Sequence, residues 1–187
     1  MLYQKNIAEE IPYTIDRTAD DLTLAQITKV GIDFLSKKSK KGFFMMIEGG
    51  KIDYASHSDD AATMIQEVLD FNAAIAEAFE FYKKHKEETL IIVTADHETG
   101  GIVLGYTGQY ELNLKELSSQ KVSIDRLTAM LKGLGTTTWG EIAGIVKENI
   151  GVEPRGNHGE KEEIEMTPDL AQRIAYEAIH DLDRKAL

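Results

Sequence analysis

Two short segments of this sequence place carboxylates beside histidines, although the chain has only five histidines. They are IEGGKIDYASH at residues 47–57 and IIVTADHETGG at residues 91–101. The side chains of interest are Glu48, Asp53, His57, Asp96 and His97. Carboxylate oxygens and neutral imidazole nitrogens suit zinc, and the chain has no cysteine to supply thiolate ligands. These five residues are the candidate metal ligands.

The spacing of Asp53 and His57 predicts that both side chains lie on one face of a helical turn, where they can converge on one ion. Taken alone, the pair is more typical of a surface ion pair at the start of a helix. Glu48 favours the metal interpretation. It follows an apolar run that predicts a buried strand, and a buried carboxylate is costly without a cation or several donors.

Asp96 and His97 follow a second apolar run. Adjacent side chains on a strand point in opposite directions, so both can serve one site only where the strand has ended in a turn. Thr99, Gly100 and Gly101 supply such a turn. The alternative interpretation is an aspartate that caps a loop beside an incidental histidine.

The elements that must position these residues form a strand–helix–strand pattern. The runs at residues 42–47 and 89–95 predict buried strands, and residues 100–105 are a possible third. A long amphipathic helix is expected at residues 59–86. Such a unit predicts parallel strands that are neighbours or near-neighbours, with the chemistry at their carboxyl ends. An earlier helix is expected to begin at the capping box of Thr23 and Gln26.

The sequence of residues 107–187 predicts a mainly helical structure. Three capped helices are expected within residues 107–187, with a loop before the last one. The predicted organisation is a partial α/β metal-site core at residues 1–106 and a helical insert or cap at residues 107–187. The fold class is therefore α/β.

Composition excludes several classes of partner. With 21 basic and 32 acidic residues, the formal charge is -11, which argues against nucleic acid and anionic membranes because no basic patch is available. The sequence has no apolar run long enough to span a bilayer and no secretion signal at its start. Clustered carboxylates fit metal ions better.

Together the motifs read E-G-G-x-I-D-x-x-x-H, then D-A-A, then I-V-T-A-D-H-E-T-G-G. The stretch from Phe43 to Gly101 closely resembles bacterial alkaline phosphatases, and weaker similarity covers most of the chain. One departure is Asp59, where relatives often carry asparagine. The resemblance implies the parallel-sheet core of the alkaline phosphatase-like fold with a mostly helical insert.

The resemblance also implies a role for each of the five candidate metal ligands. Asp53 and His57 match ligands of one zinc, Asp96 and His97 match ligands of a second, and Glu48 matches a magnesium ligand. A complete site would hold two zinc ions and magnesium, and would hydrolyse phosphate monoesters through a phosphoserine intermediate. The parent protein would be periplasmic or secreted, and a homodimer is possible.

Parts of the family pattern are missing. The sequence contains no D-S-A segment for the nucleophilic serine, no arginine matching the phosphate clamp, and no segment matching the third histidine of the first zinc site. His158 has the wrong context and is expected to be an exposed loop histidine, while His85 and His180 are expected to be solvated. The chain is therefore interpreted as an internal fragment with negligible phosphatase activity on its own.

Two alternatives stay open at this level. One is another member of the metal-dependent superfamily, such as a cofactor-independent phosphoglycerate mutase or phosphopentomutase, which shares a D-H pair but not E-T-G-G. The other is a non-catalytic domain that binds metal or a partner through its helical face. Flanking coding sequence with D-S-A upstream and a G-W-T segment downstream would identify a phosphatase fragment.

Overall fold

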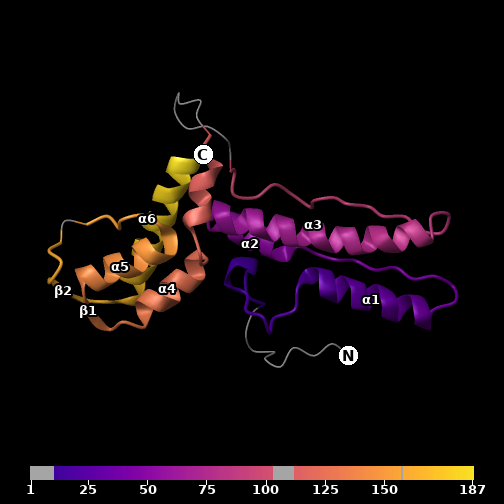
Figure 1. Ribbon diagram of the computed structural model, residues 1–187, viewed down its shortest axis with the longest axis horizontal. Helices are drawn as coiled ribbons and strands as arrows, with labels where there is room; N and C mark the ends of the chain where they lie inside the picture. Colours follow the sequence, from indigo (N-terminus) through magenta and orange to yellow (C-terminus); the bar gives the residue numbers. More distant parts are fainter. Residues whose placement is uncertain (1–10, 103–111, 157) are drawn as a thin grey trace.

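The computed structural model describes residues 11–102, 112–156 and 158–187, which form two lobes (Figure 1). The first lobe contains η1 (Thr14–Asp16), α1 (Leu24–Lys38), α2 (Gly50–His57) and α3 (Ala61–Lys84). The second contains η2 (Leu114–Ser119), α4 (Ile124–Lys132), β1 (Thr136–Thr138), α5 (Trp139–Ile150), β2 (Glu163–Glu165) and α6 (Pro168–Ala186). Within these described ranges, no helix is long and apolar enough to cross a membrane.

The expected helices are confirmed, and local signals set their ends. Thr23 and Gln26 form a reciprocal capping box at the start of α1, and Thr138 and Glu141 form another at the start of α5. Gly151 ends α5 in the left-handed conformation, with φ of 86°. In the first lobe, α1 packs along α3, and α2 packs on the N-terminal part of α3.

The hydrophobic core belongs mainly to the second lobe. Apolar faces of α4, α5 and α6 meet there, and their most deeply buried side chains are Leu127, Leu131, Ile142, Val146, Ile150, Ile179 and Leu182. Ala61 and Ala62, at the start of α3, belong to the same cluster and join the first lobe to it. Burying each of these large side chains contributes about 1.5–3 kcal/mol relative to exposure.

The two strands expected at residues 42–47 and 89–95 are not found as predicted. Both segments are drawn out alongside the helices (Figure 1), but neither is hydrogen-bonded into a sheet with any described residue. The prediction that they are buried is also wrong, because Phe44 is 88% exposed and Leu90 is 83% exposed. An apolar run fixes local extension, whereas burial requires segments on both faces. Most of the possible third strand, at residues 103–105, lies outside the described residues.

Within the described residues, the sheet lies in the second lobe and not at residues 42–47 and 89–95. β1 and β2 pair antiparallel in the second lobe, with Thr137 opposite Ile164. These residues were expected to be helix and loop, because a strand of three residues is too short to show an alternating apolar and polar pattern. The predicted boundary near residue 106 lies within residues 103–111, outside the described part of the chain, and stays a prediction.

A buried carboxylate, Asp60, connects α3 to the second lobe. Its Oδ1 accepts hydrogen bonds from the Thr63 backbone N–H at 3.1 Å and from the Gln120 side chain at 2.8 Å. Its Oδ2 accepts the Ile124 backbone N–H at 3.0 Å, at the first residue of α4. Asp60 therefore caps two helices at once. Burial raises the pKa of this carboxyl, and the hydrogen bonds oppose that rise.

Replacing Asp60 with alanine should therefore destabilise both lobes. Asp60→Ala leaves the Ile124 N–H and the Gln120 amide without this acceptor, so we expect the free energy of unfolding to fall by about 3 kcal/mol. Urea denaturation followed by circular dichroism measures the change. The matched control is Asp125→Ala, an exposed aspartate in the first turn of α4, which should cost about 0.5 kcal/mol. Equal losses in the two variants would contradict the double-capping role.

A second carboxylate, Asp183 of α6, lies at the same junction between α3 and the second lobe. Its Oδ2 accepts the Ala61 backbone N–H at 3.3 Å, and its Oδ1 has no hydrogen-bond partner among the described residues. Burial raises the pKa of Asp183 from 3.8 to about 7, and the charges of Asp60 and Asp59 add to the rise. The folded state thus holds this proton more tightly than the unfolded chain does.

The sign of the resulting pH dependence follows from that difference. The contribution of Asp183 is fully present below about pH 4 and is lost as pH rises through about 7. Asp183→Asn should therefore raise the free energy of unfolding by on the order of 2 kcal/mol at pH 8 and change it little at pH 4. Denaturation at both pH values measures this. Asp169→Asn, an exposed site on α6, is the control, and equal effects at both pH values would contradict the prediction.

Candidate metal site

Helix α2 positions the first candidate pair as the spacing predicted. Gly49 precedes α2, and Asp53 and His57 lie one turn apart on it. His57 Nε2 is 3.6 Å from Asp53 Oδ1. Both side chains are exposed, so the pair is open to solvent. The helical prediction for this pair is confirmed, and the open geometry leaves both side chains accessible to a ligand.

A glycine turn positions the second pair beside α2. Gly100 and Gly101 form the turn with φ of 76° and 60°. Gly100 packs directly on α2, since a Cβ built at this glycine would lie 2.3 Å from the Ser56 carbonyl oxygen. Only glycine combines this φ with so close an approach. The expected turn after His97 is therefore present, and it presses the second segment against the first.

Two of the candidates, His57 and His97, approach Asp53, and Asp96 joins the cluster through His97. His97 Nε2 is 4.0 Å from Asp53 Oδ1 and 3.5 Å from Asp96 Oδ2. Thr99 completes the link, since its hydroxyl donates to Asp53 Oδ1 at 2.8 Å and lies 2.9 Å from His97 Nδ1. Residues more than forty positions apart are thus joined by a carboxylate, a hydroxyl and an imidazole.

Glu48 differs from the other four. Its side chain is exposed, and in the described part of the chain no hydrogen bond or ion pair joins it to Asp53, His57, Asp96 or His97. The predicted burial of Glu48 at the end of a strand is therefore wrong, because residues 42–47 leave one face uncovered. Its role at a metal site rests on the motif alone.

The electrostatics of the cluster favour positive charge. The pKa of His97 is raised by its hydrogen bond to the Glu98 carbonyl, and then by the charges of Asp96 and Asp53. Groups that stabilise an imidazolium also attract a divalent cation. The donor types fit zinc, yet across residues 11–102, 112–156 and 158–187 no three such side chains are arranged to hold an ion. The cluster has the right chemistry in an open geometry.

The positioning role of Thr99 was not predicted, since only the fold shows that its hydroxyl reaches Asp53. The expectation that His180 is solvated is wrong. Its side chain is half-buried and packs against Tyr176 in a tilted arrangement, with ring centroids 4.0 Å apart, and its Nε2 lies 3.7 Å from Asp59 Oδ2. His158 is a loop residue as expected, although it pairs with Glu162 at 2.8 Å.

Comparison with known proteins decides the family. The family model described as alkaline phosphatase matches residues 7–177. The chain belongs to the alkaline phosphatase family. It is 42% identical over 107 residues to alkaline phosphatase 4 of Bacillus subtilis, and 40% identical over 115 residues to alkaline phosphatase 3 of the same organism. Over 75 residues it is 47% identical to the alkaline phosphatase of Escherichia coli.

These alignments cover 57%, 62% and 40% of this chain, but only 23%, 24% and 16% of the relatives. The chain thus spans a quarter or less of the length of these alkaline phosphatases. A solved structure of a cold-active alkaline phosphatase from the psychrophile Shewanella sp. has a similar fold. The TM-score is 0.66 at 23% identity, covering 91% of this chain and 52% of that one. The fold is therefore alkaline phosphatase-like.

Substituting the turn glycines separately should show what holds the cluster together. Gly100→Ala brings a methyl group against the Ser56 carbonyl, so we expect it to lower the free energy of unfolding by about 3 kcal/mol. Gly101 also has positive φ but nothing within 4 Å, so Gly101→Ala should cost only about 1 kcal/mol. Urea titrations of both variants measure the difference. Equal losses would mean that φ strain alone matters and that the contact with α2 does not.

Proposed function

We propose that this chain supplies the metal-ligand region of a phosphate monoester hydrolase. The observation that carries the proposal is the convergence of His97 and Thr99 on Asp53, which brings the D-x-x-x-H and T-A-D-H-E-T-G-G motifs together. Membership of the alkaline phosphatase family supports the reaction class. The substrates would be phosphate monoesters, whose negative charge an acidic protein can accommodate only with bound cations.

Each candidate ligand is assigned to one metal ion in this proposal. Asp53 and His57 would hold one zinc, Asp96 and His97 a second, and Glu48 would contribute to magnesium binding. Bound divalent ions of this kind offset charge on phosphoryl oxygens and lower the pKa of water. Within the protein, Thr99 orients Asp53 by donating a hydrogen bond, and Gly100 keeps the second pair against α2. Orienting partners of this type commonly change metal affinity by about 10–100-fold.

The open geometry limits what the 187 residues do alone. Each zinc would receive two protein ligands, fewer than the three usual in catalytic sites, and both pairs are exposed. The sequence also lacks a D-S-A segment for the nucleophile. We therefore infer weak metal binding and negligible turnover by the isolated chain. A periplasmic or secreted location, and a homodimeric parent protein, are part of the same proposal.

A chimera tests the function without requiring activity from the isolated chain. Residues 43–102 would replace the matching segment of B. subtilis alkaline phosphatase 4, and zinc-dependent hydrolysis of an aryl phosphate would be measured. We expect the chimera to be active and Asp53→Ala within it to lose about 100-fold or more in kcat. Glu80→Ala in the same chimera controls for general damage and should lose far less, because Glu80 is an exposed residue of α3 that pairs with Lys83 within the same segment.

Two results would contradict the proposal. One is a well-folded chimera that binds zinc in the expected amount and yet has no phosphatase activity. The other is a chimera whose activity survives Asp53→Ala. In parallel, calorimetric titration of the 187-residue chain with zinc should show affinity that falls about 10-fold in His97→Ala.

A further inference from the structure

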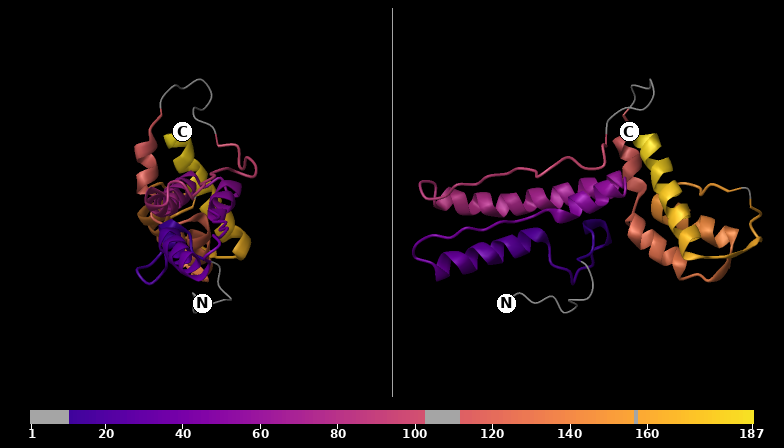
Figure 2. Two further views of the ribbon diagram at one scale, coloured as in Figure 1. Left: turned by 90° about the vertical axis from the view of Figure 1, so that its right-hand side faces the viewer. Right: turned by 180° about the vertical axis from the view of Figure 1, so that it is seen from behind.

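A surface pocket of about 290 Å³ lies between α4 and α6, next to the end of α2. The two helices pack side by side in the second lobe (Figures 1 and 2). We call this site the α4–α6 pocket. Its volume is at the lower end of the range for ligand sites, so its occupant must be small. The polar side chains that line it are Ser58, Asp125, Thr128, Lys132, Gln172 and Tyr176.

The spacing of these residues explains why the pocket is polar. Asp125, Thr128 and Lys132 are three and four positions apart, so they share one face of α4. Gln172 and Tyr176 are four positions apart and line the pocket from α6. The apolar faces of both helices belong to the core of the second lobe. The α4–α6 pocket is therefore the polar margin of a helix–helix contact.

Polar groups in the α4–α6 pocket have no partner within the described residues. Thr128 is only 9% exposed, yet its hydroxyl makes no hydrogen bond to any residue that the structure describes. The side chains of Asp125, Lys132 and Gln172 likewise form no hydrogen bond or ion pair across the described ranges. Buried polar groups in proteins are normally hydrogen-bonded. A polar molecule that enters the pocket would supply the missing partners.

Charges of opposite sign determine which molecule fits. Asp125 lies in the first turn of α4, and Lys132 lies in its last turn. An anion alone would be repelled by Asp125, and a cation alone would be repelled by Lys132. Arg126 and Arg173 neighbour lining residues in the sequence, but neither lines the pocket. The pocket therefore selects a zwitterion, with its ammonium at Asp125 and its carboxylate at Lys132.

The spacing of the two charges sets the length of that zwitterion. Asp125 and Lys132 are two turns apart, which is about 10 Å along the helix axis. Both side chains lean toward the start of the helix, so their separation is roughly preserved. Contacts of about 2.8 Å at each end leave about 5 Å for the ligand. The nitrogen and carboxyl carbon are about 2.5 Å apart in one amino acid and about 6 Å apart in an extended dipeptide.

We propose that the α4–α6 pocket binds a short zwitterionic peptide of two residues. Asp125 receives its ammonium group and Lys132 receives its terminal carboxylate. Thr128 and Gln172 form hydrogen bonds with the peptide group between these two ends. The volume of the pocket favours small side chains. This site is separate from the metal cluster, and its test uses no zinc and no phosphate ester, so it stands or falls separately from the phosphatase proposal.

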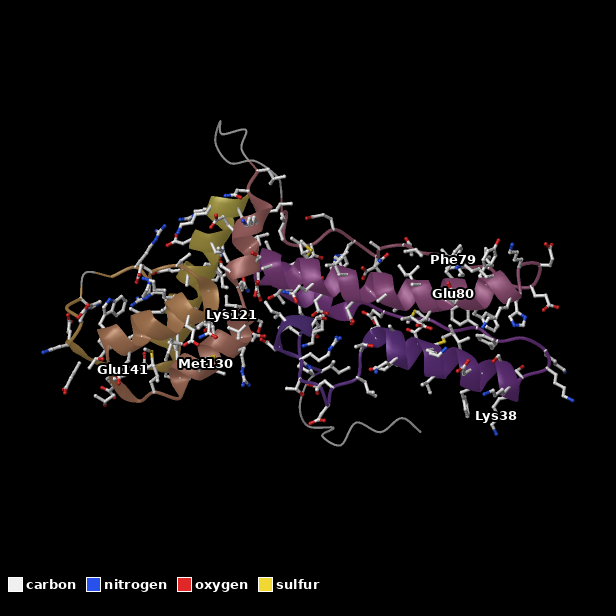
Figure 3. The ribbon with its side chains drawn as sticks, in the orientation of Figure 1. Lys38, Phe79, Glu80, Lys121, Met130 and Glu141 are labelled. Carbon is white, nitrogen blue, oxygen red and sulfur yellow. The ribbon has the colours of Figure 1, made fainter. Side chains whose placement is uncertain are left out.

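Calorimetric titration of the 187-residue chain with L-alanyl-L-alanine tests the proposal. We expect a dissociation constant on the order of 1 mM. Asp125→Asn and Lys132→Gln should each weaken binding about 10-fold, because each removes one charge-assisted contact. The matched controls, Asp169→Asn and Lys121→Gln, make the same charge changes outside the pocket, and Figure 3 shows Lys121 in the second lobe. Both controls should bind the dipeptide as the unchanged chain does.

Blocked dipeptides show whether each charge has its proposed partner. N-acetyl-L-alanyl-L-alanine lacks the ammonium and L-alanyl-L-alanine amide lacks the carboxylate, so each should bind about 10-fold more weakly. In Asp125→Asn, acetylation should weaken binding no further, whereas in Lys132→Gln it should still do so. General damage to the fold would not separate the two variants in this way.

Four results would overturn the inference. One is the absence of binding at about 20 mM dipeptide, well above the expected dissociation constant. Another is L-alanine binding as tightly as the dipeptide, since a single residue is too short to reach both charges. A third is an equal effect of acetylation in both variants. The fourth is a nuclear magnetic resonance titration in which the dipeptide shifts signals elsewhere in the chain but not those of Thr128 and Gln172.

Discussion

The three hydrogen bonds accepted by Asp60 hold the arrangement of the molecule together. A carboxylate removed from water is costly unless donors replace its hydration, and here Thr63, Gln120 and Ile124 supply them from three elements. A neighbouring contact repeats the principle, since Asp16 accepts both the backbone N–H and the hydroxyl of Ser123. The starts of α3 and α4 are consequently fixed to one another. The position of α2, and of the cluster on it, follows from this junction because only three residues separate α2 from α3.

Helix ends could be predicted because their causes are local. The side chain of Thr23 caps the helix predicted to begin there. Thr138 caps α5, and Thr167 with Pro168 starts α6, two of the three capped helices expected within residues 107–187. Strand pairing could not be predicted from the same kind of signal. The apolar runs at residues 42–47 and 89–95 correctly indicated extended chain, but the number and position of their neighbours depend on segments far away in the sequence.

In the candidate site, too, the local features could be predicted from the sequence, and the contacts between distant segments could not. The four-residue spacing of Asp53 and His57 fixes their geometry within one helical turn, and the glycines after His97 fix the turn that follows it. Both were readable from the sequence. That Thr99 bridges Asp53 and His97 was not, because it depends on how the glycine turn rests on Ser56. For Glu48 the prediction was made but was wrong, since its burial was inferred from a strand whose outer face is uncovered.

The openness of the cluster and the exposure of the two segments have one physical origin. Glu48 directly follows residues 42–47, and Asp96 directly follows residues 89–95, so each carboxylate takes its direction from the end of an unpaired segment. Water around such a segment keeps the local dielectric high and weakens the attraction of a carboxylate for a cation. Any strand that pairs with these segments excludes that water and fixes the direction of the carboxylate that follows. Order in the strands and the cation binding proposed above would therefore be coupled, and by linkage each would strengthen the other to the same extent.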